Sequence, residues 1–253
     1  MIERNSLPSP TSGNANTSTT YSGILRGSGG LTKAGNGTFT LAGPNTYSGR
    51  TTISGGTLAL SGSGSIGTGG LDLGTSGIFD LAALAAGTST LPATGNLTGA
   101  GTLSGNGKTL AVLGSFLPGN SPGTVTIGSG FTLDLSQSGT SVFEITDPAF
   151  TAGSYDRVSG SGSVIFGGVL SLAFGGGPYA GGFNVDQIFA NTGGRSGNFS
   201  AVNATGLAAG QSAMFDPTTG FITVLPEPST CAVALAGLAC GGYSLFFRRR
   251  RAR

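Results

Sequence analysis

The stretch LTKAGNGTFTL (residues 31–41) holds two short runs of alternating apolar and polar residues on either side of a Gly-Asn-Gly turn. Alternation of this kind is typical of β-strands, because successive side chains of a strand point to opposite faces. Glycine and asparagine between the runs permit a tight corner. The stretch therefore predicts a strand, a turn and a second strand.

The same pattern continues on both sides of this stretch. TTI (51–53) and TLAL (57–60) follow it, and similar short runs between glycine turns recur at 96–107 and 117–127. Strands this short, with turns this frequent, do not suit a β-sandwich. One coil cannot bury its Leu, Ile and Phe positions alone, so successive coils must stack. We predict an all-β chain that forms a right-handed parallel β-helix, or solenoid.

One copy of a known repeat is recognisable in this region. The core at 31–41, NTYSG (45–49) with TTI (51–53), and GTL (56–58) together resemble the autotransporter-associated β-strand repeat, with residues 21–30 as its lead-in. Two later elements, PGNSPG (118–123) and YDRV (155–158), resemble other parts of such proteins. The resemblance implies a parallel β-helix of the kind found in passenger regions on bacterial surfaces.

Composition divides the chain into four predicted segments. Residues 1–20 are polar and predicted to be disordered, 21–130 form the β-solenoid repeat region, and 131–225 continue it with longer strands. Most phenylalanines lie in this third segment, which we expect to act as a β-rich cap. Within the second segment, FDLAALAA (79–86) is compatible with a helical turn or two. Residues 1–21 contain no apolar run suited to a secretory signal.

Residues 226–253 form a tail of three parts. Pro226-Glu227-Pro228 precedes an apolar run from Cys231 to Phe247, and the chain then stops in RRRRAR. At 1.5 Å per residue the run covers about 26 Å, the short limit for one transmembrane helix. The arginines favour the cytoplasmic side, which places the body outside.

This order resembles the PEP-CTERM sorting signal. The resemblance implies that a membrane-embedded exosortase recognises Pro226, Glu227 and Pro228 and removes the helix. The basic residues that would stop the tail in the membrane are Arg248, Arg249, Arg250, Arg251 and Arg253. Localisation would then be a transient inner-membrane anchor at 231–247, followed by the cell surface or the extracellular space. An ordinary tail anchor is the alternative.

The chain lacks the usual chemistry of an enzyme. It has no histidine, and its two cysteines, Cys231 and Cys240, lie in the apolar run. Nucleophile systems with histidine and His- or Cys-ligated metal sites in the body are therefore excluded. We predict no catalytic residue, no cofactor and no metal. Up to Leu225 the chain has seven Lys and Arg against nine Asp and Glu, which disfavours nucleic-acid binding.

The acidic residues are scattered along the sequence, although a solenoid could bring distant ones together, as in some polysaccharide lyases and glycosidases. We predict a non-catalytic cell-surface or matrix protein processed by exosortase, with exopolysaccharide of a biofilm as a candidate partner. A surface carbohydrate-active enzyme on a β-helix and a plain tail-anchored adhesin are the alternatives.

Overall fold

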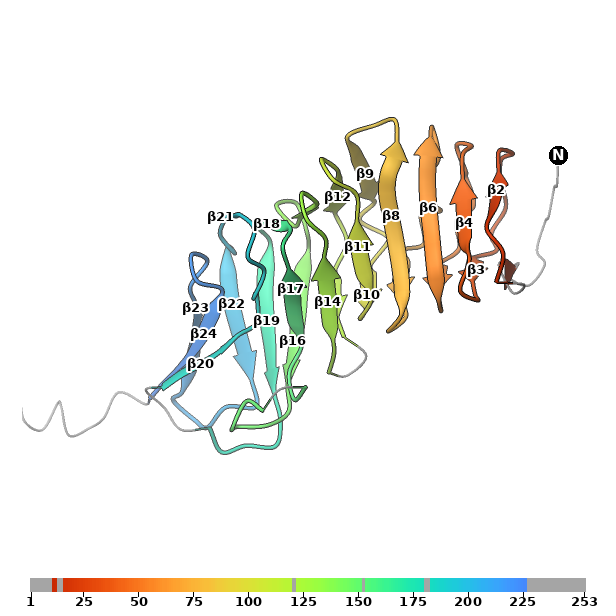
Figure 1. Cartoon of the computed structure of the whole chain (residues 1–253). Helices are drawn as coiled ribbons and strands as arrows, with labels where there is room; N and C mark the ends of the chain where they lie inside the picture. The colour runs from red at the N-terminus through yellow and green to blue at the C-terminus, as the bar shows by residue number, and fades with distance from the viewer. Residues whose placement is uncertain (1–10, 13–15, 120–121, 152, 180–182, 227–253) are drawn as a thin grey trace, which may run out of the picture.

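The computed structural model describes residues 11–12, 16–119, 122–151, 153–179 and 183–226. In these ranges the regular elements are all strands, which form four sheets and wind into one elongated body (Figure 1). The strand β2 lies toward one end of the body and β24 toward the other. The all-β class is therefore confirmed over the described part of the chain.

Three of the sheets are parallel. In spatial order, sheet A comprises β1 (Thr11–Ser12), β3 (Leu31–Lys33), β5 (Thr51–Ile53), β7 (Leu71–Leu73), β10 (Leu97–Gly99), β13 (Phe116–Pro118), β16 (Thr140–Ile145), β19 (Val169–Phe174) and β22 (Ala201–Thr205). Sheet B comprises β17 (Arg157–Gly160), β14 (Thr124–Ile127), β11 (Thr102–Ser104), β8 (Gly77–Leu84), β6 (Gly56–Gly62), β4 (Thr38–Leu41) and β2 (Thr19–Tyr21). Sheet C comprises β21 (Arg195–Gly197), β18 (Ser163–Phe166), β15 (Thr132–Asp134), β12 (Thr109–Val112) and β9 (Thr88–Leu91).

Successive turns of the chain each add one strand to sheet A, one to sheet B as far as β17, and, from β9 to β21, one to sheet C. Leu31 pairs with Thr51, Thr51 with Leu71, and Leu71 with Leu97, all in parallel register. Neighbouring strands of a sheet thus come from successive coils, which is the arrangement of a parallel β-helix. The coils stack as the short repeated runs predict, while the right-handed sense of the coil stays a prediction.

The core lies inside the stack and is built by alternation. In sheet B an inward row contains Phe39, Leu58, Phe79, Leu103 and Ile127, which are paired from coil to coil and buried. Most of the intervening positions are half-buried, and they face outward. Burial of one narrow row per sheet stabilises the body only when the coils are stacked.

Some inward positions are polar, against the expected pattern of inward Leu, Ile and Phe, and Lys33 and Thr51 are two of them. Lys33 is fully buried and donates hydrogen bonds from Nζ to the carbonyl oxygens of Ala34 (2.8 Å), Gly35 (2.7 Å) and Gly55 (3.1 Å). Thr51 is also fully buried, and its hydroxyl lies 2.7 Å from the hydroxyl of Tyr47. Burial lowers the pKa of Lys33. The hydrogen bonds satisfy groups that would otherwise be costly to bury.

The expected helical turn at 79–86 is wrong. Residues 77–84 form strand β8, in which Phe79 and Leu81 are buried while Asp80 between them is half-exposed. Leu58 of the previous coil pairs with Phe79. Hydrogen bonds between coils therefore outweigh the helix propensity of the alanines, which is a weak preference.

The part of the chain after residue 131 carries a cluster of phenylalanines. Phe166, Phe189, Phe199 and Phe215 have ring centroids 4.8–6.1 Å apart. The antiparallel sheet D lies in the same part and comprises β20 (Phe183–Gln187), β24 (Phe221–Leu225) and β23 (Ser212–Phe215). The four predicted segment boundaries, and the capping role of 131–225, stay predictions.

Candidate functional site

The structure describes one residue of the predicted sorting motif. Pro226 is exposed and follows β24 directly. Glu227, Pro228, the apolar run 231–247 and the five arginines Arg248, Arg249, Arg250, Arg251 and Arg253 lie outside the described residues. Within the described ranges there is no helix long and apolar enough to cross a membrane.

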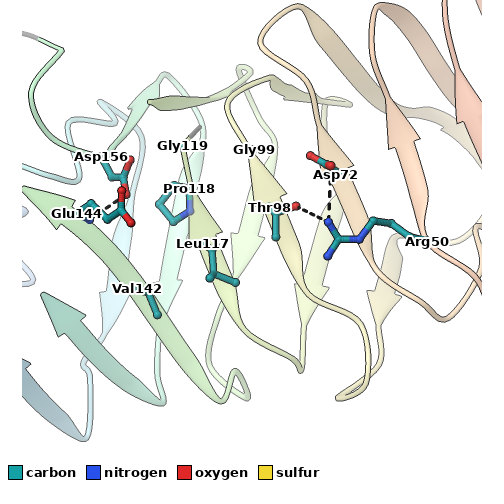
Figure 2. Close-up of a pocket in the computed structure, with 10 residues that line it drawn as sticks. All are labelled: Arg50, Asp72, Thr98, Gly99, Leu117, Pro118, Gly119, Val142, Glu144 and Asp156. Atoms are coloured by element: carbon teal, nitrogen blue, oxygen red, sulfur yellow. Dashed lines mark hydrogen bonds and ion pairs between the residues drawn. The ribbon is translucent and has the colours of Figure 1, made fainter. Parts of the chain in front are cut away.

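A shallow groove of about 420 Å³ crosses the outer face of sheet A. Its lining comes from successive coils because outward positions alternate with the buried ones on the same strands. The lining residues are Arg50, Asp72, Thr98, Gly99, Leu117, Pro118, Gly119, Val142, Glu144 and Asp156 (Figure 2). We call this the sheet A groove.

One end of the sheet A groove is polar and charged. Arg50 Nη1 lies 3.6 Å from Asp72 Oδ2 and donates a hydrogen bond of 3.3 Å to the hydroxyl of Thr98. Figure 2 shows the three side chains converging, with Leu117, Pro118 and Val142 between them and the opposite end. An exposed ion pair of this kind contributes at most about 1 kcal/mol, so these side chains remain available to a ligand.

At the opposite end of the sheet A groove lie two acidic residues, Glu144 and Asp156. Asp156 is 2% exposed, and its Oδ1 and Oδ2 each accept a 2.8 Å hydrogen bond, from the backbone N–H groups of Gly123 and Glu144 respectively. Burial, helped by the negative charge of Glu144, raises the pKa of Asp156 to about 6, although the two backbone hydrogen bonds act in the opposite direction. Gly119 has a φ of 101°, and a Cβ at that position would collide with Asp156 Oδ1.

Two neighbouring carboxyl groups with different environments are also the equipment of acid–base catalysis on sugars. Here both oxygens of Asp156 already accept backbone hydrogen bonds, so the carboxylate holds the turn around Gly123 against β16. The sequence carries no signal for this pair, because 12 residues separate Glu144 and Asp156. The two residues meet within one coil, where Ile145 and Tyr155 form an antiparallel bridge and the backbone N–H of Asp156 donates a 2.8 Å hydrogen bond to the carbonyl oxygen of Glu144, so the stacking of coils is not what joins them.

The described residues contain no group of three or more His, Cys, Asp or Glu side chains that could hold a metal ion. Asp147 and Asp216 instead accept hydrogen bonds from their own turns, at Thr151 and Thr219, and these bonds lower the pKa of each carboxyl. These two acidic residues therefore organise loops.

The coils from β3 to β6 have a counterpart in known proteins. Residues 31–60 match the passenger-associated-transport-repeat family. A stretch of 58 residues, 23% of this chain, is 43% identical to the adhesin BmaC autotransporter of Brucella suis biovar 1 (strain 1330). The stretch spans about 2% of that adhesin. The resemblance to the autotransporter-associated repeat is thus confirmed for this segment.

The matched repeat carries its own contacts between coils, which sequence reasoning missed. Asn45 is buried; its Oδ1 accepts a 2.7 Å hydrogen bond from the backbone N–H of Leu25, and its Nδ2 donates one of 2.7 Å to the carbonyl oxygen of Ser65. One side chain therefore joins three successive coils. The only sequence signal for it is an asparagine among small residues in an otherwise regular repeat.

Proposed function

We propose that the chain is an exported, non-catalytic protein of the cell surface or extracellular matrix. The observation that carries the proposal is a parallel β-helix in which residues 31–60 match a repeat of transported passengers. The partial similarity to an autotransporter adhesin supports the same location. The body would present stacked, weakly charged faces to its surroundings.

We also propose that the tail sorts the protein. Exosortase would recognise Pro226, Glu227 and Pro228 after residues 231–247 have held the chain in the inner membrane. The order of motif, apolar run and arginines supports this step. The exposure of Pro226 directly after β24 supports it further, since a protease or transpeptidase needs access to the motif.

Exopolysaccharide is the partner that we propose for the outer faces. Thr32, Thr52 and Thr98 lie in one outward row of sheet A, with Asp72 between the second and third. Hydroxyl groups both donate and accept hydrogen bonds, as sugar hydroxyls do. The row leads into the sheet A groove, where Leu117 and Val142 offer an apolar floor.

The location can be tested on intact cells of the native host. An antibody against the folded body should label intact cells or the surrounding matrix, with a periplasmic protein as the negative control for leakage. Labelling that requires cell lysis would contradict the proposed location.

A carbohydrate-active enzyme is the second candidate, favoured by the meeting of Glu144 and Asp156 at one groove. The test is release of sugar ends from the host exopolysaccharide by the purified chain and by Glu144→Gln. We expect no release by either protein. Release by the unchanged chain that disappears in Glu144→Gln would establish the enzyme instead.

A further inference from the structure

The first strand of sheet C has one free edge. Sheet C begins at β9, which pairs with β12 on one side and with no described strand on the other. The carbonyl oxygens of Gly87 and Leu91 accept hydrogen bonds from Thr109 and Leu113, on the β12 side. Because backbone groups alternate along a strand, those of Thr88 and Thr90 point to the free side.

The free edge exists because the coils change length. Thr51 and Leu71 are paired across a coil of 20 residues, whereas Leu71 and Leu97 are paired across one of 26. The longer coil adds β9, which lies behind sheet B in Figure 1. The longer coil therefore extends beyond the shorter coil before it, which leaves the edge of β9 uncovered; we call this offset the step.

A groove of about 410 Å³ fills this step. The preceding coil contributes residues 62–66, and the longer coil contributes 84–86 and 88–90. None of these residues is charged. Ser89 takes the first place in an inward row that continues with the buried Leu110, Leu133 and Val164. Since Ser89 is half-exposed, the end of this core row opens into the groove.

We propose that the free edge of β9 and the groove beside it bind an extended, uncharged peptide strand by β-strand addition. The backbone groups of Thr88 and Thr90 would supply hydrogen bonds, and a small apolar side chain of the peptide would lie over Ser89. The preceding coil lies directly beneath the edge, so a single strand fits where a folded domain does not. The uncharged lining selects against charged segments.

This inference is independent of the proposed sorting, since it depends only on the folded body. Edge strands of natural proteins are commonly protected by charged residues, proline or a covering loop. The strand β9 has the sequence Thr-Ser-Thr-Leu, which contains no charged residue and no proline. Its exposed Thr88 and Thr90 instead have strong strand propensity, as a docking edge requires.

The test uses the full chain and a dye-labelled, end-capped peptide with the sequence of residues 123–128, GTVTIG, which is uncharged and alternating. We expect saturable binding by fluorescence anisotropy. Thr90→Pro should weaken binding at least tenfold, because it removes an N–H that faces the peptide and none that faces β12. The matched control Thr90→Ala keeps that N–H and should bind like the unchanged chain.

A second comparison does not depend on the folding of any variant. A peptide methylated at its four central amide nitrogens keeps its side chains but loses the backbone N–H donors of its four central residues. It should fail to bind the unchanged protein. Equal binding of the methylated peptide, no binding of the plain peptide at millimolar concentration, or equal binding by well-folded Thr90→Pro would each overturn the proposal.

Discussion

Buried ionisable side chains are held by backbone groups. Lys33 donates to three carbonyl oxygens, and Asp156 accepts from two N–H groups. Strict alternation places Lys33 on the same face as Leu31, so its inward direction follows from the sequence. Its burial does not follow, because the carbonyl of Gly55 arrives from the next coil, and no local pattern reports that neighbour.

Replacing Lys33 tests whether its hydrogen bonds to backbone carbonyl oxygens stabilise the fold. Lys33→Met keeps an unbranched chain but leaves buried carbonyl oxygens without a donor. We expect the free energy of unfolding to fall by roughly 1–3 kcal/mol, measured by urea denaturation. The control is Lys108→Met, because Lys108 Nζ also bonds two carbonyl oxygens but from a half-exposed position. A loss at Lys108 equal to or larger than that at Lys33 would contradict the account.

The raised pKa of Asp156 predicts a pH dependence of stability. In the unfolded chain the pKa of this carboxyl is near 3.8. Between about pH 4 and pH 6 the Asp156 carboxyl therefore binds more protons in the folded chain than in the unfolded chain. Its contribution to stability is therefore complete below pH 4 and is lost as the pH rises through 6.

Asp156→Asn removes this titration. The stability of the unchanged chain relative to Asp156→Asn should thus be larger at pH 4 than at pH 7, by urea denaturation at both values. The comparison between the two proteins cancels the other carboxyl groups. A relative stability that increases from pH 4 to pH 7 would show that the sign is wrong.

At the scale of the elements, period-2 runs between glycines predict the strands well. The runs at 31–33, 38–41, 51–53 and 57–60 all lie in strands. The exception at 79–86 arises because alanines allow both a helix and a strand, and the pairing with β6 and β11 decides between them. The hydrogen-bonded neighbour of each strand lies one coil away in the sequence, which local propensity does not reveal.

Glycines at the close approaches between coils should be irreplaceable. Gly99 has a φ of 95°, and a Cβ there would collide with the carbonyl oxygen of Leu73 in the previous coil. We expect Gly99→Ala to reduce stability by about 2 kcal/mol or more, since strain and the collision add. Gly87→Ala is the control, because no atom lies within 4 Å of its added Cβ.

Thermal unfolding followed by circular dichroism compares the two variants. Gly99→Ala should melt several degrees lower than the unchanged chain, and Gly87→Ala should melt close to it. Similar melting temperatures for both variants would argue against tight stacking at the end of β10.

At the scale of the whole molecule, the stack of coils could be predicted and its surface features could not. The inability of one short coil to bury its apolar row requires stacking, whatever the sequence of each coil. The grooves depend on coil length instead. Leu71 pairs with Leu97, and Leu97 with Phe116, across coils of 26 and 19 residues. Such differences decide which outward side chains of successive coils meet, as Asp72 and Thr98 do.

In the function that we propose, an exported β-helix loses its tail at Pro226-Glu227-Pro228 and is then displayed or released. The most direct measurement is the intact mass of the mature protein from its native host, with the C-terminus sequenced. We predict an end near Pro226 or Glu227 that is lost when the three motif residues are replaced by alanine. A chain that retains Arg253 in the inner membrane would contradict sorting and indicate a plain tail-anchored adhesin.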